Sequence, residues 1–132
     1  GEAEIRYPSG QLLSVATFKN GKINGKAYEY YESGQLKLEE NYINGKLNGL
    51  SKSYYENGQL QDEIPYKNDK KEGIEKSYDE KGKLIGTITF ENNQIMEEVT
   101  YKDGKIIDRK AYPLGKDLEN ELLKNITPWQ FH

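Results

Sequence analysis

Residues 31–49 read Y-E-S-G-Q-L-K-L-E-E-N-Y-I-N-G-K-L-N-G, and residues 55–73 read Y-E-N-G-Q-L-Q-D-E-I-P-Y-K-N-D-K-K-E-G. The second stretch repeats the first after 24 residues, and weaker copies stand on both sides of the pair. Self-similarity at one fixed period is the sequence signature of a repeat array, in which each unit packs on its neighbours. The sequence therefore predicts a repeat protein.

Four sets of equivalent positions share the 24-residue spacing. They are a glycine set, a leucine set, an aromatic set and a turn set, namely Gly10, Gly34, Gly58 and Gly82; Leu12, Leu36, Leu60 and Leu84; Phe18, Tyr42, Tyr66 and Phe90; and Gly21, Gly45, Asp69 and Asn93. Four sets in one common register are hard to obtain by chance, so the period is a property of the fold.

Each unit contains two turn signals. One is a pair such as Ser33-Gly34, and the other is a pair such as Asn44-Gly45. Asn, Asp and Gly tolerate the positive φ that tight hairpin turns require. Two turns in 24 residues leave about eight to ten residues for each strand. The spacing predicts an all-β antiparallel meander of about nine strands.

Alternation along the strands predicts which side chains share a face. Leu36, Leu38, Glu40 and Tyr42 lie on one side of their strand, and Lys37, Glu39 and Asn41 lie on the other. A glycine near the start of each second strand predicts a bulge or a bare spot on which a neighbouring ring can lie, as at Gly25, Gly49 and Gly73.

The pattern weakens toward the C-terminus. Lys71, Asp79 and Glu97 depart from it, and Pro113-Leu114-Gly115 is expected to end the sheet. Leu118, Leu122, Leu123 and Ile126 then follow at helical spacing. We therefore expect two parts, a β-hairpin repeat array over residues 1–112 and, over residues 113–132, a short C-terminal capping helix and tail packed on the array.

Composition limits the classes of function. Hydrophobic residues make up 34% of the chain and include 11 Tyr, which predicts a thin core with tyrosine supplying much of the apolar surface. The net charge of −3, with both signs scattered, argues against a nucleic-acid partner. No apolar run is long enough to span a bilayer. The chain starts at Gly1 without an initiator Met, which favours an extracytoplasmic protein trimmed of a signal peptide.

Catalytic and ligand-binding motifs are not recognised in the sequence. The one histidine is the terminal His132, and there is no cysteine. Carboxylate neighbours such as Glu39-Glu40 and Asp62-Glu63 are expected to point to opposite faces of their strands, so they are not expected to act as catalytic pairs. No calcium loop and no phosphate-binding glycine loop is present. We expect a protein that is not an enzyme and that holds no cofactor and no metal.

The units Y-E-S-G-Q-L and Y-E-N-G-Q-L, with the stretch I-N-G-K-L-N-G, resemble the MORN-variant repeats of bacterial proteins. The resemblance covers residues 7–112 and implies a single-layer, elongated and twisted antiparallel sheet. Bacterial members are often labelled antitoxin-like, and related eukaryotic repeats are described as scaffolds and possible phospholipid binders. The resemblance therefore implies binding, without specifying a mechanism.

Tyrosines recur on the second strands and are the candidate binding residues. A single-layer sheet cannot cover both of its faces, so one tyrosine series stays partly exposed. We expect a non-enzymatic scaffold that binds a protein partner through an exposed tyrosine-rich sheet face, with the anchors Tyr30, Tyr54 and Tyr78.

Two alternatives remain open. One is an antitoxin or immunity-type protein that neutralises a single toxin, which rests on the family resemblance. The other is an extracytoplasmic glycan or cell-wall binding module, favoured by the aromatic and glycine hairpin repeats; the single Trp counts against it. Phospholipid or glycan contact has no other support in the sequence.

Overall fold

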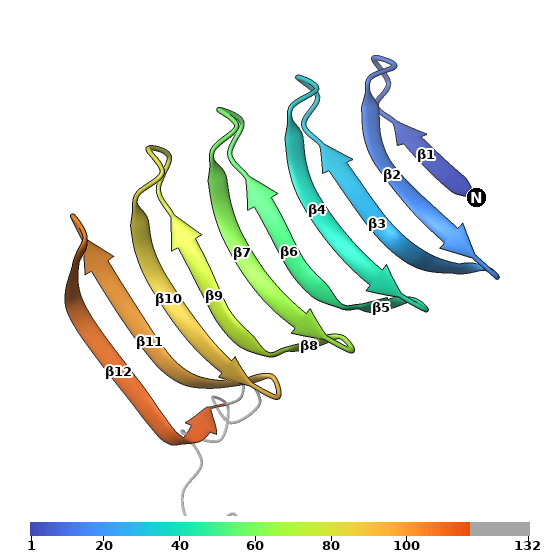
Figure 1. Ribbon diagram of the computed structural model, residues 1–132. Coiled ribbons are helices and arrows are strands. Elements are labelled where there is room, and N and C mark those ends of the chain that lie inside the picture. Colours follow the sequence, from blue (N-terminus) through green and yellow to red (C-terminus); the bar gives the residue numbers. More distant parts are fainter. Residues whose placement is uncertain (117–132) are drawn as a thin grey trace, which may run out of the picture.

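The computed structural model describes residues 1–116, which form one β-sheet (Figure 1). Its strands are β1 (Glu2–Arg6), β2 (Leu12–Lys19), β3 (Lys22–Tyr30), β4 (Leu36–Ile43), β5 (Lys46–Leu47), β6 (Gly49–Tyr54), β7 (Leu60–Lys67), β8 (Lys70–Lys71), β9 (Gly73–Tyr78), β10 (Leu84–Glu91), β11 (Gln94–Lys102) and β12 (Lys105–Lys116). The predicted capping helix lies outside the described residues.

The strands follow one another across the sheet in the order of the chain. The path runs β1-β2-β3-β4-β6-β7-β9-β10-β11-β12, every pair is antiparallel, and the strands lie side by side in one curved layer (Figure 1). This arrangement confirms the predicted all-β antiparallel meander. Each unit adds one hairpin, so equivalent residues of successive units lie at the same position along the strand direction.

The predicted number of about nine strands was wrong, because the sheet contains 12. Ten strands form the continuous path, and the two-residue strands β5 and β8 lie beside β4 and β7. Asn48 separates β5 from β6, which begins at Gly49. In the same way Glu72 separates β8 from β9, which begins at Gly73. Gly49 and Gly73 have φ angles of 101° and 113°, which side chains disfavour, so the backbone bends there and the ladder is interrupted.

Asparagine-rich turns form one edge of the array, as predicted. At Asn20-Gly21, Asn44-Gly45 and the corresponding pairs both central residues have positive φ, the geometry of a type I′ hairpin turn. These turns also connect the units. The amide of Gly45 donates to the Ile23 carbonyl at 2.8 Å, and the amide of Asp69 donates to the Leu47 carbonyl at 2.9 Å.

A ladder of tyrosine hydroxyl groups connects the turns at the other edge. The hydroxyl groups of Tyr7, Tyr31 and Tyr55 donate to the backbone carbonyls 23 residues later, those of Tyr30, Tyr54 and Tyr78, at 2.7, 2.6 and 2.7 Å. Each ring therefore spans two successive units. We call Tyr7, Tyr31 and Tyr55 the tyrosine ladder.

Glycines lie opposite three members of the aromatic set. Gly25 pairs with Tyr42, Gly49 with Tyr66 and Gly73 with Phe90 across neighbouring strands. A Cβ atom at Gly73 would lie 3.1 Å from Cγ of Pro65, so a side chain there is opposed by both space and φ. The prediction of a bulge is supported at these glycines, because the register shifts opposite Gly25 and the strand is interrupted just before Gly49 and Gly73.

The core is as thin as the composition predicts. Over residues 1–113, for which burial is described, the buried hydrophobic residues are Phe90 and Val99, with 7% and 5% of their surface exposed. Most other inward-facing side chains are half-buried. Stability therefore comes mainly from contacts between neighbouring strands and from the two rows of turns, as in other repeat arrays.

The predicted end of the sheet at Pro113 was wrong. Strand β12 continues to Lys116, which pairs with Ile95 after an irregularity in the register. Among the described strands β12 lies at the end of the sheet order. A proline is tolerated there because one side of an edge strand needs no ladder hydrogen bond from its backbone N–H.

Candidate functional site: two faces of one sheet

The pairing register assigns the side chains to two faces, because directly opposed residues of antiparallel strands share a face and successive residues alternate. Alternation along β3, β6 and β9 places Tyr28, Tyr30, Tyr54 and Tyr78 on one face with Lys52, Lys76, Leu50 and Ile74. We call it the tyrosine face. At the ends of these strands a register irregularity sets Tyr30, Tyr54 and Tyr78 opposite Leu36, Leu60 and Leu84. The other face carries Glu40, Asp62 and Glu75 together with Tyr42 and Tyr66, and we call it the acidic face.

The predicted anchors Tyr30, Tyr54 and Tyr78 lie at equivalent positions at the ends of β3, β6 and β9. All three are half-buried, so part of each ring is exposed. Within residues 1–116 their hydroxyl groups form no hydrogen bond to the protein. In contrast, the hydroxyl groups of the tyrosine ladder are all used between units. The structure thus separates a structural tyrosine series from one whose hydroxyl groups remain available.

A row of alternating charges crosses the tyrosine face. Glu39 pairs with Lys52, Lys52 with Glu63, and Glu63 with Lys76. The ammonium group of Lys26 also lies 3.1 Å from Oε1 of Glu39, and this hydrogen bond raises the pKa of Lys26. Opposite charges in direct cross-strand pairs stabilise a sheet and leave the face with little net charge.

Apolar side chains form a second row on the same face. Leu50 pairs directly with Pro65, and Ile74 lies on β9, the next strand of the path. Leu50 is 39% exposed and Ile74 is 50% exposed. Exposed aliphatic residues and tyrosines on one face are typical of protein-binding surfaces, whereas the charged row resembles the polar rim of such surfaces.

The acidic face is more enclosed and carries carboxylates without direct cross-strand cations. Burial raises the pKa of Glu75, and the nearby Lys71 offsets only part of this effect. Burial and the charges of Glu40 and Glu75 also raise the pKa of Tyr66. Ser51, only 6% exposed, has a buried hydroxyl group without a hydrogen-bond partner.

Tyr42 provides a measurable consequence of this environment. Its burial, followed by the charge of Glu40, raises its pKa to about 12, and its hydroxyl group donates to Oε1 of Glu40 at 3.2 Å. An unfolded tyrosine titrates near pH 10. The stabilisation linked to Tyr42 is therefore complete below about pH 10 and is lost as the pH rises toward about 12.

We therefore expect Tyr42→Phe to reduce the loss of unfolding free energy between about pH 10 and 12, the interval between the two pKa values. Denaturant titrations at successive pH values measure this slope, and NMR of the Tyr42 ring gives the pKa. Glu40→Gln should lower that pKa part of the way toward its ordinary value. A Tyr42 midpoint near pH 10 in the folded protein would contradict the assignment.

The neighbouring carboxylates noted in the sequence do point to opposite faces. Glu39 lies on the tyrosine face and Glu40 on the acidic face, and Asp62 and Glu63 are divided in the same way.

Among residues 1–116, no group of three or more His, Cys, Asp or Glu side chains is arranged to hold a metal ion. In the same part of the chain no helix is long and apolar enough to cross a membrane.

Sequence reasoning missed the division of charge between the faces and the use of the second tyrosine series. The sequence shows acidic and basic residues interspersed in every unit. Only the strand register shows that Lys52 and Lys76 meet Glu39 and Glu63, whereas Glu40 and Asp62 gather on the other side. The 24-residue spacing of Tyr7, Tyr31 and Tyr55 was the available signal for the ladder.

The fold and its two exposed faces define a single-layer β-hairpin repeat protein, a class that works by presenting an extended surface. The chain matches the family described as MORN repeat variant over residues 1–20, 23–44, 47–68 and 71–92, which is more than half of its length. It belongs to this family. Repeats of this kind are generally modules that bind proteins or membranes. No significantly similar sequence was found among curated proteins.

Proposed function

We propose that the chain is a non-enzymatic scaffold that binds a protein partner through its tyrosine face. The observation that supports this most is the row Tyr30, Tyr54 and Tyr78, whose rings are partly exposed and whose hydroxyl groups form no hydrogen bond within residues 1–116. Partly exposed tyrosines present apolar area together with a polar tip at a small cost in conformational entropy, which suits protein recognition.

The surroundings of the tyrosines favour a protein over a charged polymer or a lipid surface. The charged row from Glu39 to Lys76 alternates in sign, so it presents no cationic patch to phosphates. The exposed Leu50 and Ile74 add apolar contact area on the same face. A protein surface with complementary apolar and charged groups can contact the tyrosines, the charged row and the apolar row at the same time.

A crosslinking experiment tests which face binds. The chain contains no cysteine, so single cysteines can carry a photo-crosslinker at the neighbouring positions Lys76, on the tyrosine face, and Glu75, on the acidic face. In extracts of the source cells, we expect one dominant protein to crosslink to the Lys76→Cys protein and not to the Glu75→Cys protein. Crosslinking from the Glu75 position alone would place binding on the acidic face and refute the proposal.

A further inference from the structure

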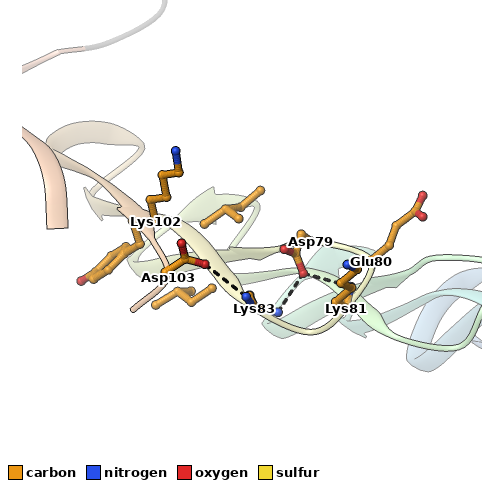
Figure 2. A pocket seen from close by; sticks show the side chains of 9 residues that line it. Asp79, Glu80, Lys81, Lys83, Lys102 and Asp103 are labelled. Atoms are coloured by element: carbon orange, nitrogen blue, oxygen red, sulfur yellow. Dashed lines mark hydrogen bonds and ion pairs between the residues drawn. The ribbon is translucent and has the colours of Figure 1, made fainter. Parts of the chain in front are cut away.

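The tyrosine ladder is interrupted in the fourth unit. The residue 24 positions after Tyr55 is Asp79. Its Oδ1 atom accepts hydrogen bonds from the backbone amides of Lys81 and Lys83, both at 2.9 Å, so the carboxylate turns back onto its own turn (Figure 2). These hydrogen bonds, with that from Lys83 foremost, lower the pKa of Asp79. Asp79 therefore does not span the gap to the next hairpin.

The residue that corresponds to Tyr30, Tyr54 and Tyr78 one unit later is Tyr101. Gly86 pairs with Thr100 in the way that Asp62 pairs with Ser77, so Tyr101 follows Thr100 as Tyr78 follows Ser77. In the described part of the chain no tyrosine hydroxyl group donates to the Tyr101 carbonyl. The two turns are joined instead at their rim, where Nζ of Lys83 lies 3.1 Å from Oδ1 of Asp103 (Figure 2). An acceptor is thus present without its ladder donor.

A cavity of about 460 Å³ lies where the fourth ring would stand. Residues of the turn at 79–83 form one side of it, and residues 101–103 form the other. Leu84, the 42% exposed Ile85 and Tyr101 provide apolar surface. This volume falls in the range of sites that hold small ligands or single side chains.

The charges around the cavity do not favour an ion. Three lysines and three acids line it, namely Lys81, Lys83, Lys102, Asp79, Glu80 and Asp103. One lysine and one acid already form the ion pair between Lys83 and Asp103, and Asp79 is held by its own turn. A neutral ring with one hydrogen-bond donor matches such a site better than an anion or a cation does.

We propose that this cavity binds a tyrosine side chain of a partner protein, whose ring takes the place of the missing fourth ladder ring and whose hydroxyl group donates to the Tyr101 carbonyl. The chain supplies the precedent three times, at Tyr7, Tyr31 and Tyr55. This site is separate from the row of Tyr30, Tyr54 and Tyr78, and it stands whether or not that row binds a partner.

The first test uses N-acetyl-tyrosinamide as a probe, with N-acetyl-phenylalaninamide as its match without a hydroxyl group. Titration of the full chain, followed by NMR of the backbone amides, should give saturable shifts at residues 79–85 and 101–103. We expect N-acetyl-tyrosinamide to bind at least threefold more tightly than N-acetyl-phenylalaninamide. Equal affinity for both probes, or the absence of saturable shifts at these residues, would overturn the proposal.

A double variant tests the site from the side of the protein. Asp79→Tyr with Lys81→Asn recreates the Y-E-N-G sequence of residues 55–58, where Oδ1 of Asn57 accepts the turn hydrogen bond from the Gln59 amide at 2.9 Å. This variant completes the ladder from within the chain. It should melt at a higher temperature than the original protein and lose at least tenfold in affinity for the tyrosine probe.

Two single variants test whether the cavity itself holds the probe. Glu56→Tyr introduces a tyrosine into the equivalent turn of a unit whose ladder position is filled, and it should leave probe binding unchanged. Ile85→Glu alters the exposed apolar wall without touching the turn, and it should abolish binding even if the double variant does not fold. If the probe bound only after Trp129→Ala and Phe131→Ala, the occupant would be this chain's own C-terminal segment, and the proposal would be wrong.

Discussion

Deletion of residues 36–59 leaves a chain that folds into the same sheet with one unit fewer. The deletion joins Gln35 to Leu60, which recreates the natural step from Gln59 to Leu60. Strand β7 then takes the place of β4 beside β3, and the Tyr31 hydroxyl group meets the Tyr78 carbonyl in place of that of Tyr54. Since the stability of a repeat array is close to a sum over neighbouring units, we expect a loss of about 1–4 kcal/mol.

A shorter deletion should do greater damage. Removal of residues 44–55 joins Ile43 to Glu56 and takes away one turn with strands β5 and β6. Strands β4 and β7 run in the same direction, and a parallel pair needs a crossover of about a dozen residues, which the shortened chain lacks. We expect this variant to lose cooperative unfolding. Circular dichroism and thermal melts compare the two deletions, and a native-like melt of the shorter one, or unfolding of the longer one, would contradict the repeat register.

The hairpin architecture could be predicted because turn chemistry is local. The pairs Asn20-Gly21 and Asn44-Gly45 require only that two adjacent residues tolerate positive φ, and both do so in the structure. The 24-residue period then places each strand beside the next without knowledge of any tertiary contact. For the same reason the glycines opposite the aromatic set, such as Gly49 opposite Tyr66, could be predicted from their 24-residue spacing.

Features that depend on contacts between units were not predicted. The second strand is interrupted at Asn48, beside the bend at Gly49, although the backbone amide of Asn48 still donates to the Asn41 carbonyl of β4, and alternation does not reveal this interruption. The replacement of tyrosine by Asp79 is visible in the sequence. Its consequence is visible only when the three preceding hydroxyl groups are seen to reach carbonyls 23 residues away. Pro113 led to the wrong prediction that the sheet ends there. Proline is tolerated in β12 because this strand lies at the end of the sheet order, and that position cannot be read from a local sequence pattern.

The candidate binding residues were partly predictable. Alternation predicts that adjacent tyrosines such as Tyr30 and Tyr31 point in opposite directions. Alternation does not show which series is structural, because the hydrogen bond from the Tyr31 hydroxyl group to the Tyr54 carbonyl depends on how the next unit is aligned with the first. The exposed Leu50 and Ile74 stand 24 residues apart, at the repeat position that Lys26 takes in the preceding unit. The 24-residue spacing shows that they are equivalent, but it does not show that they are exposed.

Replacement of Tyr30, Tyr54 and Tyr78 by serine should lower the affinity for the crosslinked partner at least about 100-fold. Aromatic anchors in protein interfaces commonly contribute about 1–2 kcal/mol or more each, and every 1.4 kcal/mol is tenfold in affinity. The three rings are half-buried, so their loss also costs some stability, and we expect the melting temperature to fall by less than about 10 °C. Isothermal titration calorimetry and thermal melts measure the two effects.

The tyrosine ladder supplies the matched control for this loss of affinity. Conversion of Tyr7, Tyr31 and Tyr55 to phenylalanine removes three hydrogen bonds between units at a cost of about 1 kcal/mol each. It lowers stability by a similar amount and leaves the rings of the tyrosine face in place, so partner affinity should change less than about threefold. If both triple variants lost affinity equally, the loss would reflect weakened folding and the tyrosine face would not be the binding surface. Because the phenylalanine variant loses stability and keeps the rings of Tyr30, Tyr54 and Tyr78, a difference in affinity between the two variants separates the loss of these rings from a general loss of stability.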